Sequence, residues 1–184
     1  MLVFPDKKFK TIYADPPWLE SGGGQIKRGA DRHYPLMKTK DIMALPIQNL
    51  AEENCHLYLW VTNNFLQDGL GVMKAWGFIY KTKITWVKGV YAYGQLSLEN
   101  PGLGQYFRGL DEVCLFGVKG CLPYKVKDGK RQQGTTVLIA PRGRHSEKPK
   151  EMYDIIEKVS YPDYLELFAR NPREGWVSWG NELL

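Results

Sequence analysis

The sequence has few of the features that mark membrane, secreted or zinc-binding proteins. Its 184 residues include three cysteines and three histidines, and its apolar runs fall short of the roughly 20 residues of a membrane helix. The first ten residues lack the apolar segment of a signal peptide. The cysteines have no paired spacing and the histidines are scattered, so we expect no metal site. These absences predict a cytoplasmic protein that does not contact a membrane.

The remaining composition is typical of one globular domain. Hydrophobic residues make up 43% of the chain and charged residues 24%, and 184 residues are enough for a single core. We therefore predict one domain over residues 1–184. The net charge of +5 is compatible with a polyanionic partner, although a solvated face explains the basic run at 125–131 equally well.

Apolar and β-branched runs alternate with two amphipathic segments along the chain. The runs that predict buried strands are Phe9–Ala14, His56–Thr62, Lys83–Lys88, Val113–Val118, Val137–Ala140, Tyr164–Phe168 and Trp176–Trp179. Helices are predicted over Phe65–Trp76, before Gly77, and from Pro149 onward. This alternation predicts an α/β domain with a mostly parallel sheet and helices on both faces.

The periodicity also predicts which residues are buried and where ligands bind. The first helix places on one face Leu66, Leu70, Met73 and Trp76. The segments Leu19–Pro35 and Gly89–Asp111 follow neither period, so we expect irregular loops there. Ligands bind at the carboxyl ends of parallel strands, and Asp15 and Arg170 each follow a predicted strand.

The most informative motif is Asp15-Pro16-Pro17-Trp18, directly after the first predicted strand. The lone pair of adenine's exocyclic amine is delocalised into the ring, so this nitrogen needs acceptors for its N–H groups to become a nucleophile. The Asp15 carboxylate and the Pro16 carbonyl are two such acceptors, and Pro17 stiffens the turn that carries them. Trp18 offers a flat face to an unstacked base. The alternative is a proline turn that ends a strand and buries the tryptophan.

Further blocks along the chain carry a family resemblance. They are YADPPW at Tyr13–Trp18, LYLWVTN at Leu57–Asn63, ITWVKG at Ile84–Gly89, EVCLFGVKG at Glu112–Gly120, HSEKP at His145–Pro149, ELFAR at Glu166–Arg170 and WVSWGNE at Trp176–Glu182. In this order they resemble the family named for the seventy-kilodalton AdoMet-binding subunit of eukaryotic mRNA adenosine methyltransferase. The resemblance implies a Rossmann-like class I methyltransferase of permuted order, in which the catalytic motif precedes the cofactor-binding strand.

The resemblance also implies roles for the matching residues toward S-adenosylmethionine (AdoMet). Asp15 would contact the target amine and the methionyl amino group of the cofactor, and Lys148 would pair with its methionyl carboxylate. The remaining cofactor contacts would come from Glu166, Leu167, Phe168, Arg170, Asn171, Asn181 and Glu182. Asn171 is included because the chain lacks a His-Asn pair that the eukaryotic enzyme carries after this arginine.

Substrate contacts are expected from the irregular and basic segments. The segment Glu20–Pro35 resembles the first active-site loop of the family, which implies substrate contacts from Arg28, Arg32, His33 and Tyr34. The segment Gln105–Glu112, with Tyr106 and Arg108, resembles the segment that forms the interface or the target contacts of the family. In the basic run, Lys125 and Lys127 would follow the phosphates of a nucleic acid. For any one of these residues a solvated loop is the competing interpretation.

The resulting hypothesis is methylation of the adenine exocyclic amine in DNA. RNA is the main alternative, because a flipped or single-stranded adenine looks similar in both polymers. A non-catalytic nucleic-acid-binding partner subunit is another alternative, but it should lack the acidic residue and the cofactor lysine that are present as Asp15 and Lys148. Methyl transfer to protein or a small molecule is disfavoured by the aromatic residue after the prolines. A homodimer, a heterodimer and a monomer all stay open.

Overall fold

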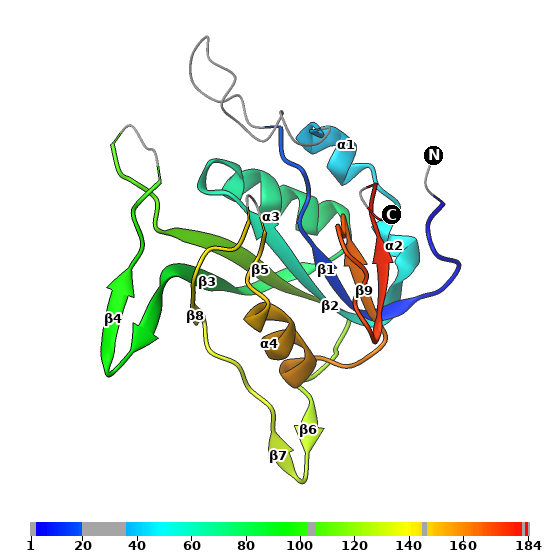
Figure 1. Cartoon of the computed structure of the whole chain (residues 1–184). Helices are drawn as coiled ribbons and strands as arrows, with labels where there is room; N and C mark the ends of the chain where they lie inside the picture. The colour runs from blue at the N-terminus through cyan, green and yellow to red at the C-terminus, as the bar shows by residue number, and fades with distance from the viewer. Residues whose placement is uncertain (1–2, 20–35, 103–105, 145–146, 182, 184) are drawn as a thin grey trace.

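The computed structural model describes residues 3–19, 36–102, 106–144, 147–181 and 183. An eight-stranded sheet has the order β10-β9-β1-β2-β5-β3-β4, with β8 paired to β3 (Figure 1). Its strands are β1 (Phe9–Ala14), β2 (Ala51–Val61), β3 (Ile79–Ala92), β4 (Gln95–Leu98), β5 (Asp111–Lys119), β8 (Val137–Ala140), β9 (Tyr164–Leu167) and β10 (Trp176–Trp179). The short strands β6 (Val126–Lys127) and β7 (Lys130–Arg131) form a separate two-stranded ribbon.

The strands of the large sheet run mostly in one direction. β10, β9, β1 and β2 are parallel neighbours, and β8 is parallel to β3. β5 is antiparallel to both β2 and β3, and β4 is antiparallel to β3. Of the eight described strands, β4 and β5 therefore run against the other six. The predicted α/β class with a mostly parallel sheet is confirmed, and each predicted strand is present.

Helices cover both faces of the sheet, as predicted. α1 (Thr39–Met43), α2 (Ile47–Leu50) and α3 (Leu66–Ala75), which follows the short 3-10 helix η2 (Asn63–Phe65), lie on one face, and α4 (Glu151–Val159) lies on the other (Figure 1). Side chains alternate between the two cores, so Ile12 packs under α1–α3 whereas Tyr13 packs under α4. Among the described residues, no helix is long and apolar enough to cross a membrane.

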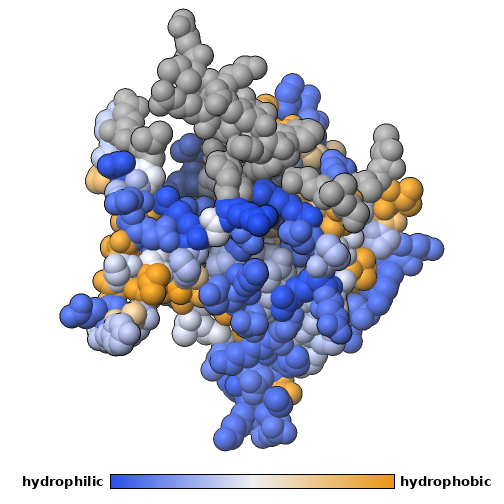
Figure 2. Space-filling view, viewed as in Figure 1, coloured by the Kyte–Doolittle hydropathy of each residue, from blue (hydrophilic) through white to orange (hydrophobic). Residues whose placement is uncertain are grey.

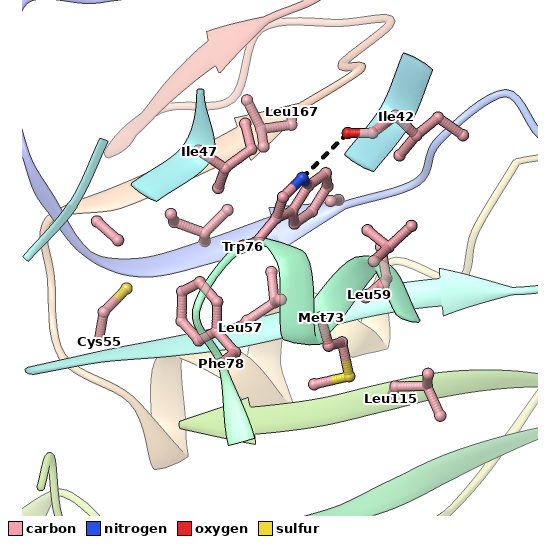
Figure 3. Packing of buried hydrophobic residues seen from close by; sticks show 14 of the residues in the cluster. Ile42, Ile47, Cys55, Leu57, Leu59, Met73, Trp76, Phe78, Leu115 and Leu167 are labelled. Atoms are coloured by element: carbon pink, nitrogen blue, oxygen red, sulfur yellow. Dashed lines mark hydrogen bonds between the residues drawn. The ribbon is translucent and has the colours of Figure 1, made fainter. Parts of the chain in front are cut away.

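α3 lies close against the sheet and ties α1 to it. Met73 and Trp76 are buried, and the Trp76 indole N–H donates a hydrogen bond to the Ile42 carbonyl at 3.0 Å (Figure 3). A side chain at Gly117 of β5 would overlap the end of Met73, so the glycine allows the helix to approach. At its C-terminus Gly77 has φ of +83°, which confirms the predicted helix stop.

The predicted buried face of this helix is half wrong. Leu66 and Leu70 are 42% and 39% exposed, whereas Gly69 and Val72 face the sheet beside Met73 and Trp76. A glycine contributes nothing to a hydrophobic pattern, so the true stripe was not apparent from the sequence. In α4, by contrast, two apolar residues one turn apart, Met152 and Ile156, are buried against the sheet.

The segment Gly89–Asp111 is not irregular throughout, contrary to the prediction. β3 continues to Ala92 and turns at Tyr93-Gly94 into β4. Both turn residues have positive φ, +52° and +76°, as a two-residue type I′ hairpin requires. Tyrosine is a rare choice at such a position, so the turn gave no recognisable signal.

Candidate active site

A cavity of about 360 Å³ opens at the carboxyl ends of β1 and β9, next to the start of α4. It is lined by Tyr13, Asp15, Glu147, Lys148, Lys150, Tyr153, Glu166, Phe168, Arg170, Asn171, Pro172 and Arg173. We call it the first cavity. Its volume lies within the roughly 300–1,000 Å³ range of small-molecule sites. Six of the predicted cofactor residues therefore meet in one place: Asp15, Lys148, Glu166, Phe168, Arg170 and Asn171.

The central pair of this cavity is Asp15 and Lys148. The Lys148 Nζ lies 2.7 Å from the Asp15 Oδ2, and the side chains are 15% and 25% exposed. Burial raises the pKa of Asp15, although the nearby Lys148 ammonium opposes that change. The same ammonium lies 5.5 Å from the centre of the Trp60 ring. The pair thus places two largely desolvated charges at the end of β1.

Two further charges extend this pair into a chain. The Lys148 Nζ lies 3.5 Å from the Glu112 Oε2, and the Lys88 Nζ lies 2.6 Å from the Glu112 Oε1. Burial alone would raise the pKa of Glu112, but the Lys148 and Lys88 ammoniums together hold it below its usual range. Lysine and carboxylate therefore alternate along one edge of the sheet. We call Lys88, Glu112, Lys148 and Asp15 the charge chain.

A second carboxylate faces the first cavity from β9. The Tyr153 hydroxyl donates a hydrogen bond to the Glu166 Oε1 at 2.9 Å, while the Arg173 guanidinium lies 4.3 Å from the Tyr153 ring centre. The other oxygen of Glu166 is buried without a partner in the described part of the chain. Burial raises the pKa of Glu166 to about 7. This carboxylate is therefore prepared for a ligand that donates hydrogen bonds.

Other buried polar atoms near the carboxyl ends of the strands also lack partners. Among the described residues, three more have a buried side-chain oxygen or nitrogen without a partner: Thr62 after β2, and Ser178 and Trp179 on β10. Buried polar groups in proteins are normally hydrogen-bonded. These unpaired groups are concentrated near the carboxyl ends of β2, β9 and β10.

The Asp-Pro-Pro-Trp turn is held rigidly, but Trp18 does not face the cavity. Its indole N–H donates to the Trp60 carbonyl at 3.0 Å, its ring stacks on Phe65, and its side chain is 5% exposed. The expectation that this ring offers a face to a base is therefore wrong for this structure. Trp18 instead anchors the turn to β2. The Pro16 carbonyl accepts a hydrogen bond from the Trp18 backbone N–H at 2.9 Å and keeps a second lone pair.

Two other predicted cofactor residues do not line the first cavity, and Phe168, which does, has an unusual backbone conformation. The Leu167 side chain is fully buried in the core beneath α1–α3, so it cannot line the cavity. Asn181 is exposed and does not line the cavity. Phe168 lines it with φ of +63°, a left-handed conformation that is costly for an aromatic residue. This turn directs the chain toward Arg170.

The predicted substrate residues are separated by the length of the strands. Lys125 and Lys127 belong to the β6–β7 ribbon, where the Lys125 Nζ donates to the Glu157 carbonyl of α4 at 2.9 Å. Four residues before Lys125, the Cys121 backbone N–H donates a hydrogen bond to the Asn54 Oδ1 at the start of β2. The ribbon thus projects away from the sheet at its amino edge, at the bottom of the view (Figures 1 and 2). Phosphate tracking by Lys125 and Lys127 stays a prediction, and any nucleic acid that they bind would lie at the amino edge of the sheet, away from Asp15.

Tyr106 and Arg108 lie in the segment before β5. Arg108 donates hydrogen bonds to the Gly102 and Pro101 carbonyls at 3.1 and 3.2 Å, which shapes the loop before β5. Tyr106 is 86% exposed on the same loop. Next to it is a second cavity of about 390 Å³, lined by Trp86, Lys88, Gly102, Gly109, Asp111, Glu112, Arg142, Gly143, Arg144 and Glu147. The predicted positions Arg28, Arg32, His33, Tyr34 and Glu182 lie outside the described residues.

Several site residues were not predicted from the sequence. Glu112 was not predicted because β5 is antiparallel and brings its first residues to the carboxyl edge. Lys88 ends the predicted strand Lys83–Lys88, so its position was available from the sequence, but its pairing with Glu112 was not. Tyr153 lies in the first turn of α4, on the helix that was predicted from Pro149, so its position was available as a signal. Arg173 follows the predicted pocket segment directly.

Comparison with known proteins now places this geometry in a family. The model of the MT-A70 family matches residues 9–182, nearly the whole chain. The chain belongs to the MT-A70 family. It is therefore a member of a methyltransferase family with the class I fold, as the sequence motifs indicated.

Named relatives fall into two size classes. The type II methyltransferase M.MunI of a Mycoplasma species is 33% identical, with 97% of this chain matched to 79% of that protein. Human METTL4, an N(6)-adenine-specific methyltransferase, is 31% identical, and the match covers 97% of this chain and 38% of the relative. The human N(6)-adenosine-methyltransferase catalytic subunit METTL3 is 30% identical over 96% of this chain and 28% of its own length. The chain thus spans well under half of the lengths of METTL4 and METTL3.

Proposed function

We propose that this protein transfers a methyl group from AdoMet to the exocyclic amine of adenine in DNA, as a single domain. The observation that carries the proposal is the Asp15–Lys148 pair, which stands on a rigid proline turn beside a cavity with an unpaired buried carboxylate oxygen. Adenine is supported by the names of METTL4 and METTL3, which specify N(6) methylation. DNA is supported by size, because the chain matches most of a bacterial type II methyltransferase.

The first cavity suits the chemical groups of AdoMet. Lys148, Lys150 and Arg170 supply positive charge for a carboxylate, while Asp15 and Glu166 supply acceptors for an ammonium and for hydroxyls. The unpaired Glu166 oxygen fits a ribose hydroxyl in particular. When bound, AdoMet supplies a methyl group already activated by its sulfonium charge, so no metal is needed for that activation.

The residues of the turn then act on the target amine. The Asp15 Oδ2 accepts from Lys148, so we assign the Oδ1 to one N–H group of the amine. The second lone pair of the Pro16 carbonyl accepts from the other N–H group. By accepting hydrogen bonds from both N–H groups, these two oxygens raise the electron density on the nitrogen and make its lone pair available. Trp18 keeps both oxygens in place through its hydrogen bond to the Trp60 carbonyl.

A methyl-transfer assay with AdoMet tests this proposal. It should compare single-stranded DNA, duplex DNA and RNA, each carrying adenine, with the wild-type protein, Asp15→Ala and the control Asp154→Ala, which alters an exposed carboxylate on α4. We expect Asp15→Ala to lower transfer by at least about 10³-fold while AdoMet binding persists in weakened form. Asp154→Ala should behave as the wild type.

The outcomes of this assay separate the candidates. Transfer to RNA and not to DNA would replace the proposed substrate with the alternative. A wild-type protein that methylates none of the three polymers, or an Asp15→Ala variant with full activity, would overturn the proposed function.

A further inference from the structure

Lys88 stands outside the first cavity but at the end of the charge chain. Its side chain is 14% exposed, and its ammonium lies 2.6 Å from the Glu112 Oε1 and 5.1 Å from the centre of the Trp86 ring. It comes from β3, whereas Glu112 begins the neighbouring strand β5. The ion pair and the ring contact together fix the position of the Lys88 ammonium.

The two carboxylates beside Lys148 in the charge chain lie at different distances from its ammonium. Lys148 lies 2.7 Å from Asp15 but 3.5 Å from Glu112, although both carboxylates are within its reach. Glu112 already has a partner at 2.6 Å in Lys88. Because a carboxylate neutralised at close range attracts a second cation less, Lys148 settles nearer to Asp15.

We propose that Lys88 is a positioning residue. By binding Glu112, it lets Lys148 form its short ion pair with Asp15. This role rests on the proposed methyl transfer. Lys88 touches neither Asp15 nor the first cavity. It acts through two intermediaries, Glu112 and Lys148. The geometry of the catalytic motif, which follows β1, therefore depends on a residue of β3. In the sheet, β2 and β5 lie between these two strands.

Removal of the Lys88 charge has a direct consequence in this arrangement. Glu112 is 23% exposed and would need a new partner, and in the described structure Lys148 is the other ammonium beside it. Lys148 would move toward Glu112 and leave Asp15 without its short ion pair. The pKa of Asp15, already raised by burial, would then rise further.

Asp15 has several charged or titratable neighbours, and these set the background for any pH measurement. They are Lys148, Glu112, Arg170, Tyr13, Cys114, Tyr153 and Glu166. Lys88 is not in direct contact with Asp15, so a change in the titration of Asp15 on removal of Lys88 must pass through the chain. A direct contact between Lys88 and nucleic-acid phosphates, from the second cavity, would instead leave that titration unchanged.

A kinetic cycle tests the proposal with Lys88→Met, Lys88→Arg, Glu112→Gln and the double variant Lys88→Met/Glu112→Gln. The matched control is Lys83→Met, which alters an exposed lysine of the same strand. We expect Lys88→Met to lower kcat by about 10- to 100-fold, as the loss of orienting partners commonly does, and to shift the acidic limb of the pH–kcat profile to higher pH. Lys88→Arg should restore most of the activity.

The double variant gives the sharpest outcome of the cycle. If Lys88 acts through Glu112, the double variant should be no slower than Glu112→Gln alone, because the intermediary is already neutral. Independent, multiplying losses would overturn the proposal. So would wild-type kinetics in Lys88→Met, or an unshifted acidic limb.

A carboxyl-¹³C NMR titration of the protein without cofactor or substrate separates this proposal from the proposed function. We expect the Asp15 resonance to titrate at higher pH in Lys88→Met than in the wild type, and Lys83→Met to leave it unchanged. A shift in a protein that transfers no methyl group would support the charge chain and overturn only the proposed function. An unmoved Asp15 titration in an active enzyme would overturn the positioning role of Lys88.

Discussion

Buried polar groups at the two ends of the sheet differ in how well they are satisfied. Toward the amino edge, the Ser160 hydroxyl lies 2.7 Å from the His56 Nδ1 and 2.8 Å from the Tyr58 hydroxyl, and the His56 Nε2 meets the Leu122 carbonyl at 3.0 Å. At the carboxyl edge, Glu166 and Trp179 are among the residues with buried atoms that lack a partner in the described ranges.

This difference distinguishes structural polar groups from functional ones. A closed network contributes to stability and offers nothing to a ligand, because its donors and acceptors are already used. Unpaired groups destabilise the protein until a ligand arrives, and they are found where function needs them. Burial lowers the pKa of His56 and raises that of Glu166 to about 7, and the Glu166 carboxyl lines the first cavity.

The largest expected effect is at the amino edge. Ser160→Ala would leave both His56 and Tyr58 with an unpaired buried group, and each such loss costs roughly 1–3 kcal/mol, so we expect the free energy of unfolding to fall by about 2–4 kcal/mol. Urea unfolding at neutral pH measures this change, with Ser97→Ala on the exposed strand β4 as the control. AdoMet affinity of the folded variant should be unchanged. A loss of affinity, or a cost near zero, would break the comparison.

The two ends should also respond to pH in opposite directions. Below about pH 6.5 the unfolded chain protonates His56 more readily than the folded protein does, so this group lowers the free energy of unfolding as pH falls. Between about pH 4.5 and 7 the folded protein holds a proton on Glu166 that the unfolded chain releases, so this group lowers stability as pH rises. Each slope is at most about 1.4 kcal/mol per pH unit.

The variant Glu166→Gln removes the contribution of the Glu166 carboxyl and leaves the pH dependence that comes from His56. Its free energy of unfolding should fall more steeply on acidification from pH 6.5 to 5 than that of the wild type, as denaturant titrations at several pH values would show. Parallel curves for the two proteins would mean that the Glu166 carboxyl does not titrate in this window.

The smallest expected effect concerns nucleic-acid binding. Arg144 lies at the second cavity, whereas Lys127 lies on the ribbon at the amino edge. We expect Arg144→Gln to reduce the slope of log affinity against log salt by about one unit, and Lys127→Gln to leave it unchanged. A reduced slope in Lys127→Gln would instead place nucleic acid across both ends of the molecule.

Much of the fold was available in the sequence because strand burial is a strong signal. The runs at Phe9–Ala14 and Val137–Ala140 are observed as strands with the predicted bounds. The hairpin between β6 and β7 was not predicted, although Asp128-Gly129 is a favoured type I′ turn. Its two strands have two residues each and are mostly basic, so they show no apolar run. The short helices α1 and α2 have too few residues to show a period.

The site was predictable where a residue follows a strand and unpredictable where tertiary structure decides. Asp15, Glu166 and Arg170 were located from strand ends and motif blocks, and they share one cavity. Trp18 was misread because the sequence does not show that the β2 backbone offers its indole a carbonyl. Lys88 and Glu112 become neighbours only through an antiparallel pairing, which no local pattern specified.

The most direct test of the account is a calorimetric titration of AdoMet into the wild-type protein, Lys148→Met and Lys127→Met. We predict one binding site, an affinity at least about tenfold weaker in Lys148→Met, since a charged hydrogen bond is worth roughly 1.5–3 kcal/mol, and an unchanged affinity in Lys127→Met. Equal affinity in all three proteins, or no binding to the wild type, would contradict the assignment of the carboxyl edge as the cofactor site.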